Sequence, residues 1–140
     1  MTDIMSSQKR SELMSLVGAK DTTPELVIRK QLFARGYRYR LHVRNLPGTP
    51  DIVFPGRRKV IFVHGCFWHR HSGCRHATTP ASRRDYWLPK FARTVERDAE
   101  AIERLTQLEW DSIVVWECET RKLERTMKEI VRFLENKVVA

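Results

Sequence analysis

The chain has 140 residues, of which 41% are hydrophobic and 31% are charged, and its formal net charge is +9 at pH 7. This length suits one domain with a single core. No segment approaches the roughly 18 consecutive apolar residues of a membrane span, and the first residues lack the apolar stretch of a signal peptide. We therefore expect a cytoplasmic protein that makes no membrane contact.

The positive charge is concentrated in the first two thirds of the chain. Up to Arg93 there are 18 lysines and arginines against 6 acidic residues, whereas the remainder has 8 against 11. Such a segregated basic region predicts a polyanionic partner, most commonly nucleic acid, and the acidic region is expected to face away from it. The alternative is that basic residues only aid solubility.

Residues 1–20 are expected to form a mobile arm that ends in a short helix. A polar, basic segment, SSQKRS, precedes the apolar residues Leu13, Met14, Leu16 and Val17. Such an arm can reach around a duplex, and Met14 can wedge between base pairs from the minor groove. From these residues alone, docking of the apolar tip on the core is the favoured alternative.

A helix is predicted from Pro24 to about Arg35. Thr23 is the expected N-cap, Pro24 suits the first helical position, and Gly36 ends the helix. Glu25 lies in the first turn, where any carboxylate is stabilised by the helix dipole. A functional role for Glu25 requires that this helix terminus face the active site.

The next segments predict three strands that bring a carboxylate and a histidine together. Residues 37–44 alternate Tyr, Tyr, Leu and Val with Arg, Arg, His and Arg, which indicates a half-buried strand with a basic outer face. Residues 50–54 and 60–64 predict two further, antiparallel strands. Asp51 and His64 should then lie close together across the ladder.

This placement favours metal-assisted hydrolysis of a phosphodiester. A carboxylate at a strand edge, together with a neighbouring backbone carbonyl, is a partial oxygen shell of the kind that magnesium prefers. A nearby histidine can take a proton from the attacking water, and His64 and His69 are the candidates. An isolated aspartate or histidine is more often structural, so the hypothesis depends on the combination.

Residues 65–76, GCFWHRHSGCRH, which we call the metal loop, are unusually rich in imidazole and thiol groups. Cys66, His71 and Cys74 supply three ligands from one loop, and Cys118 at the end of an apolar strand predicted at 111–118 is the remaining cysteine. Four such ligands suit a tetrahedral structural zinc site. The alternatives are reduced cysteines without metal and, less favoured because the count is odd and nothing indicates secretion, a disulfide.

The last third of the chain predicts two amphipathic helices. Residues 78–84 form a basic loop expected to follow the phosphate backbone, and Lys90 is the candidate for reading a base edge, although a solvated lysine is equally expected. The first helix presents Phe91, Val95, Ile102 and Leu105 on one face and places Glu96, Asp98, Glu100 and Glu103 mostly toward solvent. Thr120 should cap the second, whose core positions are Leu123, Met127, Ile130, Val131 and Leu134.

Together these segments resemble a known family. Pro50 and Asp51, a hairpin and residues 60–64 resemble the PD-(D/E)-x-K nuclease core, but with FVH where a second acidic residue and a lysine usually stand. That departure, with GCFWHRH at 65–71, YWLPKF at 86–91 and VWEC at 115–118, resembles the very short patch repair (Vsr) DNA mismatch endonucleases. The resemblance extends from about Met5 over nearly the whole chain.

The resemblance implies an α/β, restriction-endonuclease-like core with a mixed central β-sheet, flanking helices and a structural zinc site. Residues 1–20 would be a DNA-clasping arm and residues 21–140 the endonuclease domain. Such enzymes nick one strand on the 5′ side of the T in a T:G mismatch, which arises when 5-methylcytosine deaminates. The expected partners are double-stranded DNA with a T:G mismatch and downstream repair proteins, and the expected state is a monomer.

The resemblance also implies roles for individual residues. Asp51 and the backbone carbonyl of Val63 would hold magnesium, His69 would be the general base, and His64 and Glu25 would position waters. The structural zinc would be held by Cys66, His71, Cys74 and Cys118, with Cys74 one residue later than is usual in the family. Phe67, Trp68 and Trp87 would enter the duplex from the major groove and Met14 from the minor groove, with packing of the aromatic residues on the metal loop as the alternative.

Two other functions remain open from the sequence. A zinc-containing DNA-binding module without catalysis would also explain the charge, the metal ligands and the aromatic residues. A magnesium-dependent nuclease of the same core could act on another nucleic-acid structure, although an aromatic wedge favours a distorted or mismatched duplex over an intact one.

Overall fold

The computed structural model describes residues 22–136, so the predicted arm at residues 1–20, including Met14, lies outside the described part. The described helices are α2 (Thr23–Ala34), α3 (Arg84–Gln107) and α4 (Leu123–Glu135), and the strands are β1 (Arg40–Leu41), β2 (Ile52–Phe54), β3 (Lys59–His64) and β4 (Asp111–Trp116). Two short 3-10 helices, η1 (Pro55–Arg57) and η2 (Glu117–Lys122), follow β2 and β4.

The four strands form one mixed sheet in the order β1-β2-β3-β4. β2 and β3 pair antiparallel, with Ile52 opposite Ile61, which confirms the predicted hairpin. β3 and β4 pair in parallel over their full length, from Lys59 opposite Asp111 to His64 opposite Trp116. A parallel pair needs a long crossover, and α3 provides it.

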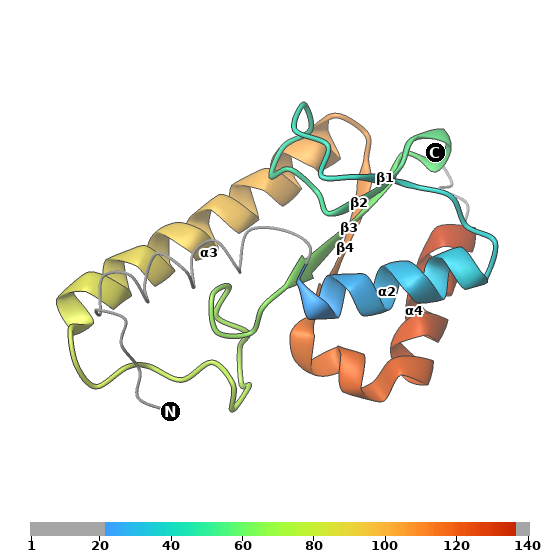
Figure 1. The fold of residues 1–140 in the computed structure, drawn as a ribbon. Helices are drawn as coiled ribbons and strands as arrows, with labels where there is room; N and C mark the ends of the chain where they lie inside the picture. The colour runs from blue at the N-terminus through green and yellow to red at the C-terminus, as the bar shows by residue number, and fades with distance from the viewer. Residues whose placement is uncertain (1–21, 137–140) are drawn as a thin grey trace, which may run out of the picture.

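Helices cover both faces of the sheet (Figure 1). α2 and α4 bury Ile28 and Ile130 against one face, where Ile61 of β3 also points. α3 buries Leu105 against the other face, beside Phe62 of β3. Because successive residues of a strand point to opposite faces, β3 contributes to both cores. The predicted mixed α/β architecture with flanking helices is thus confirmed.

The strand predicted at residues 37–44 is wrong in extent, because regular pairing covers only Arg40–Leu41. The predicted alternation is nevertheless present, since Tyr39 and Leu41 pack against the core while Arg40 is exposed. His42 ends the ladder because its φ of 47° is left-handed. Its backbone N–H still donates to the carbonyl of Asp51, at 3.1 Å.

Both predicted threonine caps are wrong. α2 begins one residue earlier than predicted, with Thr22 as its N-cap, and that cap makes no side-chain hydrogen bond. α4 begins at Leu123 after η2, and the Thr120 hydroxyl donates instead to the carbonyl of Glu117, at 2.7 Å. The strand predicted at residues 111–118 likewise stops at Trp116, because the chain turns into η2 there.

α3 is longer than the sheet that it covers, and its first half projects well beyond the strands (Figure 1). Phe91 and Leu105 are buried as predicted. Val95 is 46% exposed, contrary to prediction, since the sheet does not extend to that part of the helix. The loop predicted at residues 78–84 ends at Arg83, because Arg84 is the first residue of α3.

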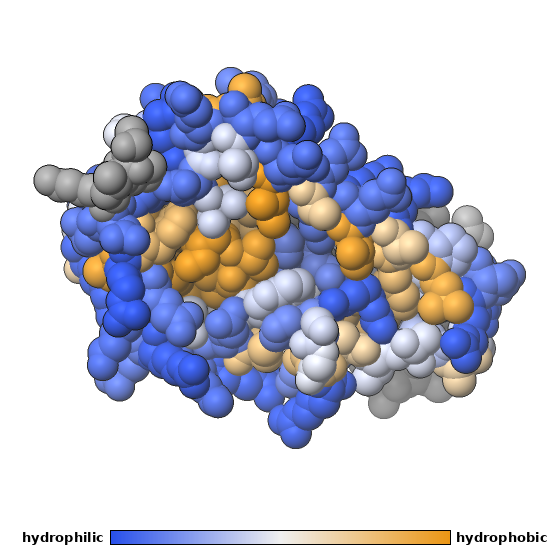
Figure 2. Space-filling model, turned by 180° about the vertical axis from the view of Figure 1, so that it is seen from behind, coloured by the Kyte–Doolittle hydropathy of each residue, from blue (hydrophilic) through white to orange (hydrophobic). Residues whose placement is uncertain are grey.

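Hydrophilic residues cover most of the rear face, with hydrophobic residues gathered mainly in a hollow on the part that carries the sheet (Figure 2). Among the described residues, no helix is long and apolar enough to cross a membrane.

Candidate active site and metal centre

A cavity of about 660 Å³ opens between the sheet and α3, and we call it the catalytic cavity because the predicted catalytic residues Asp51, His64 and His69 line it. Its ionisable lining residues come from four parts of the chain and comprise His42, Arg44, Asp51, His64, His69, Arg97 and Asp98. Gly48 closes one side: its φ is +76°, and a Cβ there would lie 2.7 Å from that of Ala101. Only glycine therefore allows the turn before β2 to approach α3 this closely.

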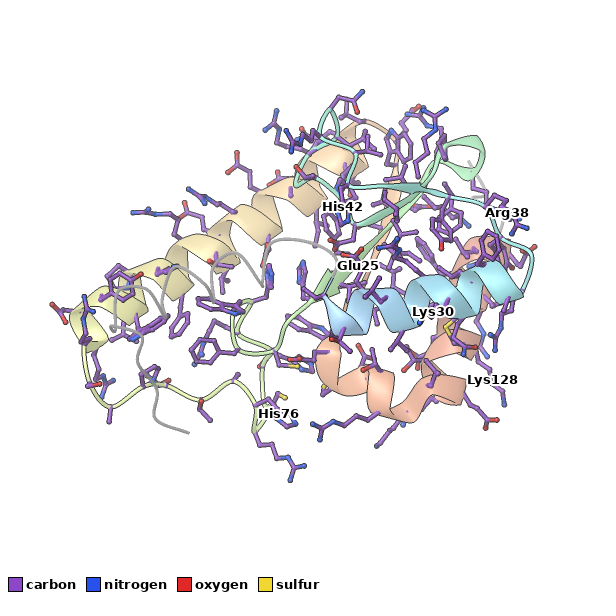
Figure 3. All side chains as sticks on the ribbon, viewed as in Figure 1. Glu25, Lys30, Arg38, His42, His76 and Lys128 are labelled. Carbon is purple, nitrogen blue, oxygen red and sulfur yellow. The ribbon has the colours of Figure 1, made fainter. Side chains whose placement is uncertain are left out.

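Asp51 is held at the start of β2 by the neighbouring strand. The backbone N–H of Val63 donates to its Oδ2 atom at 2.8 Å. His42 lies on its other side, with Nδ1 3.8 Å from Asp51 Oδ1 and Nε2 3.2 Å from Glu25 Oε2. Glu25 and His42 accordingly lie together where the start of α2 meets the segment after β1 (Figure 3).

Glu25 and Asp51 place two carboxylates in a poorly hydrated site. Glu25 is 1% exposed and contacts His42 of the cavity lining, so the helix terminus that carries it does face the site. Burial raises the pKa of Asp51 to about 6, and the Glu25 carboxylate adds to the rise, whereas the N–H of Val63 and His42 oppose it. A carboxylate whose pKa is raised by burial and by a neighbouring carboxylate, as that of Asp51 is, is stabilised in its ionised form by a bound cation.

Two histidines and an aspartate form a second group in the cavity. The rings of His64 and His69 stack with centroids 3.9 Å apart, and His69 Nδ1 lies 2.6 Å from Asp98 Oδ2. A neutral imidazole that donates from Nδ1 has its lone pair on Nε2, so Asp98 favours the tautomer in which Nε2 accepts a proton. Burial lowers the pKa of His64 to about 4, and the adjacent His69 also lowers it while Asp98 opposes.

The structure changes the partners predicted for the site residues. Asp51 and His64 both line the catalytic cavity. However, the potential ligand atoms form two separate groups, and within each group all atoms lie within 4.8 Å of one another. Asp51 is grouped with Glu25 and His42, whereas His64 is grouped with His69 and Asp98. The simple prediction that His64 would be the neighbour of Asp51 is therefore replaced by two groups on one cavity.

His42 and Asp98 are members of these groups that sequence reasoning missed. The sequence pattern assigned Asp98 to the solvent side of its helix, which is wrong. Asp98 stands seven residues from both Phe91 and Leu105, which are buried, so this spacing could have placed it on the inner face. No comparable signal exists for His42, because its position depends on a left-handed backbone that the alternating pattern does not predict.

The four predicted zinc ligands come together in the structure, and we call this group of side chains the zinc cluster. The ligand atoms of Cys66, His71, Cys74 and Cys118 all lie within 4.8 Å of one another. His71 Nδ1 is 3.6 Å from Cys66 Sγ and 3.5 Å from Cys118 Sγ. A tetrahedral zinc with ordinary bond lengths requires an S···N separation of about 3.6 Å, so these side chains fit the ion, and Cys74 reaches the cluster despite its later position.

The predicted wedge residues form one aromatic cluster at the projecting end of α3. Phe67 contacts Trp68 and Trp87 with ring centroids 5.1 and 5.7 Å apart. Phe67 also meets the buried Phe91 at 5.2 Å. The three wedge candidates are only partly buried, so the cluster is anchored on α3 through Phe91 while its other members remain accessible.

Two cations accompany the aromatic cluster. Lys90 Nζ lies 5.2 Å from the ring centroid of Trp68. Arg70 places its guanidinium 4.0 Å from the ring centroid of Phe91 and donates to the carbonyls of Ala77 and Thr78, at 3.0 and 2.9 Å. Arg70 thereby ties the metal loop and the basic loop to α3, which holds the aromatic cluster beside the catalytic cavity.

Comparison with known proteins identifies relatives over most of the chain. Residues 2–75 match the family model described as DNA mismatch endonuclease Vsr. A type II nicking enzyme, V.XorIIP from Xanthomonas oryzae pv. oryzae, is 51% identical over 123 residues, which cover 88% of this chain and 90% of the relative. The DNA mismatch endonuclease Vsr of Escherichia coli is 40% identical over 129 residues, 92% of this chain and 82% of that protein.

Proposed function

The chain belongs to the Vsr family of DNA mismatch endonucleases, and from this premise we propose that it nicks the T strand on the 5′ side of a T:G mismatch in a magnesium-dependent hydrolysis. Membership makes the protein a DNA endonuclease. The specific lesion, the strand and the magnesium ion belong to the proposal, as do a restriction-endonuclease-like core, a monomer acting in the cytoplasm and contacts with later repair proteins.

One observation carries the proposal: Asp51, which lies beside the buried Glu25, shares a single cavity with a histidine–aspartate pair. Asp51 and Glu25 provide oxygen ligands on one side. His69, supported by Asp98 at 2.6 Å, provides a base on the other. Hydrolysis of a phosphodiester needs a cation to stabilise negative charge and a group that accepts the proton of the attacking water.

The donor set near Asp51 fits magnesium. In a strand, the N–H and C=O of a residue point to the same side, and the N–H of Val63 points to Asp51. The Val63 carbonyl is therefore available on the same side as the carboxylate. Magnesium bound there by Asp51 and this carbonyl would supply charge stabilisation at the phosphate, and Glu25 would position waters of its hydration shell.

His69 is proposed as the general base. Its Nδ1 atom donates to Asp98, so Nε2 is the nitrogen that takes the proton from the attacking water. The stacked His64 is kept neutral by burial, which lowers its pKa to about 4. Because His64 is neutral, it does not repel the protonated form of His69, as a cation would. It also does not compete with His69 for the Asp98 carboxylate. His64 therefore holds the His69 ring in place and completes the hydrogen bonding of the site.

The remaining site residues have supporting roles in this proposal. Zinc on Cys66, His71, Cys74 and Cys118 would fix the metal loop, which carries His69 and two aromatic residues. Phe67, Trp68 and Trp87 would enter the duplex beside the mismatch, where unstacking costs least. Lys90, held against the rings of Trp68, Tyr86 and Trp87, would contact the nucleic acid at the same place. Met14 of the predicted arm would act from the minor groove.

The direct test is a nicking assay on a short duplex labelled on both strands. A single T:G mismatch is compared with a homoduplex, in magnesium or in EDTA, and wild type with His69→Ala. We expect a magnesium-dependent nick confined to the T strand and lost in the variant. Tight binding without a nick would support a non-catalytic zinc module instead, and equal cutting of the homoduplex would indicate a nuclease with another target.

A second variant separates mismatch recognition from chemistry. Replacing Phe67 and Trp68 together by alanine should reduce the preference for T:G over homoduplex while the catalytic cavity stays intact. The ratio of single-turnover nicking rates on the two duplexes measures this preference. An unchanged ratio would contradict the proposed wedge.

A further inference from the structure

We propose that a second cavity, beside the zinc cluster, binds backbone phosphates of the duplex away from the cleavage point. This inference rests on the proposed action on DNA. The cavity has a volume of about 430 Å³ and we call it the basic cavity. One wall is the end of the metal loop at residues 74–76, and the other is formed by η2 and the first turns of α4.

The lining of the basic cavity carries an excess of cations. Its charged residues are Arg75, Arg121, Lys122 and Arg125 against Glu119 and Glu129, and His76 also contributes. Glu119 accepts a hydrogen bond from the backbone N–H of Trp116 at 2.8 Å, and Glu129 lies 3.9 Å from Arg125. Both acidic side chains thus already face donors of the protein itself.

Three of the cations in this cavity have no partner among the described residues. Within residues 22–136, Arg75, Arg121 and Lys122 make no hydrogen bond or ion pair through their side chains. All three are exposed. Pairing with an external anion would therefore break no existing interaction, which distinguishes them from Arg70, whose donors are occupied by carbonyls of the basic loop.

The topology places the basic cavity on the same edge of the sheet as the catalytic cavity. β3 and β4 run in parallel, so both end at one edge. The end of β3 brings His64 to the catalytic cavity, and the end of β4 leads directly into η2. The metal loop connects the two cavities, with His69 in one and Arg75 in the other. Ligands of such sheets bind outside the carboxyl ends of the strands.

The zinc cluster makes the connection rigid. Cys118 lies in η2, while Cys66 and His71 lie in the metal loop, and all three contribute to the cluster. A bound zinc would therefore hold the two walls of the basic cavity at a fixed separation and at a fixed position relative to His69. A duplex that occupies the catalytic cavity would meet cations whose backbone positions are fixed relative to His69.

Phosphate is the chemistry that this lining suits best. Arginine donors match phosphate oxygens, lysine contributes a point charge, and no apolar anchor of the kind that dominates protein interfaces lies among the lining residues. Phosphate contacts position a protein on the duplex without reading sequence. The basic cavity would therefore fix the register of the mismatch over the catalytic cavity and affect binding rather than the chemical step.

The test compares two double variants that remove equal charge. Arg121→Ala with Lys122→Ala removes two unpaired cations of the cavity, whereas Lys128→Ala with Arg132→Ala removes two exposed cations of α4 outside it. Lys128 points away from the metal loop, which His76 marks (Figure 3). Affinity for a T:G duplex and for a homoduplex is measured by fluorescence anisotropy in EDTA over a series of salt concentrations.

For the cavity variant we expect the slope of log affinity against log salt to become less steep by about 1.8, which corresponds to two lost phosphate contacts. When salt is raised from about 50 to 200 mM, both proteins should lose affinity, and the factor lost by the cavity variant should be roughly 12 times smaller than the factor lost by wild type. The same decrease is expected on the homoduplex, and the nicking rate at saturating enzyme should stay unchanged. The α4 variant should keep a slope close to that of wild type.

The proposal would be overturned if the cavity variant had the same slope as wild type, or if both variants changed the slope equally. An acidic protein segment would then be the next occupant to test. This outcome is distinct from failure of the proposed function. If wild type binds DNA but does not nick at T:G, the activity is wrong, and the salt slopes still decide the phosphate site.

Discussion

The zinc cluster and the catalytic cavity are two polar centres joined by one loop, and they are built in opposite ways. Three zinc ligands come from nine residues, Cys66 to Cys74, and the fourth follows a parallel strand. The catalytic cavity combines the segment after β1, the start of β2, the end of β3, the metal loop and α3, and Glu25 of α2 contacts its lining through His42. The first centre is suited to hold the fold and the second to carry out chemistry on a held substrate.

Removal of a zinc ligand should give the largest effect on stability. For Cys118→Ala we expect the free energy of unfolding to fall by about 3 kcal/mol or more, because a structural zinc contributes its binding energy to folding. Zinc content by mass spectrometry should drop from one ion per chain to none, with a matching loss in thermal melting. The exposed Ser72→Ala on the same loop is the control, and an unaltered melting curve for Cys118→Ala would contradict a structural role.

Asp51→Asn should show the reverse pattern. The nicking rate is expected to fall by about 10³-fold or more, since the cation loses its charged ligand, whereas duplex affinity and thermal stability should be kept. The amide also removes a charge that burial beside Glu25 opposes. Single-turnover nicking and melting curves measure both, with the exposed Glu103→Gln as the matched control. Comparable losses of stability in Asp51→Asn and Cys118→Ala would erase the contrast between the two centres.

Asp98→Asn should have an intermediate effect on the rate. The amide no longer stabilises a protonated His69, so we expect about a 10²-fold lower nicking rate. The rate should also depend differently on pH, which loss of packing alone would not cause. Glu100→Gln, two residues away and exposed on the same helix, should be unaffected. If Asp98→Asn kept the rate and the pH profile of wild type, Asp98 would have no role in positioning His69.

The smallest effect concerns pH and magnesium. In the metal-free protein the pKa of Asp51 is raised from 3.8 to about 6. The folded state therefore binds an extra proton between these values, so this group's contribution to stability is full below pH 3.8 and is lost as the pH rises through 6. Magnesium binds the ionised form, so its apparent affinity should fall about tenfold per pH unit below 6. Titration calorimetry checks this, and an affinity independent of pH from 5 to 7 would contradict it.

The comparison also explains how much of each centre sequence reasoning predicted. The zinc ligands were predicted together because their residue types and spacing within one loop are unusual. The groups of the catalytic cavity were predicted only in part: Asp51, His64, His69 and Glu25 were named, but the predicted pairing of Asp51 with His64 was wrong. His42 and Asp98 were missed because their neighbours in space are distant in the chain, so local pattern carries little information about them.

The prediction of secondary structure failed beside the catalytic cavity, at residues 37–44, and before α4, at Thr120. The long apolar and alternating segments gave strands β2 and β3 and the helices correctly in kind. The predicted strand at residues 37–44 was too long because His42 adopts a left-handed conformation beside Glu25 and Asp51. Thr120 does not cap α4 because η2 inserts one more turn before it. In each case tertiary contacts outweighed the local preference.

By itself the sequence determined the elements of this protein, its family and the chemistry that its loop can support, because periodicity, charge and ligand type are local properties of the chain. Tertiary structure alone decided that Asp98 orients His69, that His42 joins Glu25 and Asp51, and that two cavities flank one metal loop. These features depend on the order of the strands and on the placement of α3 across the sheet. Such long-range packing is decided by the whole core, and no single segment encodes it.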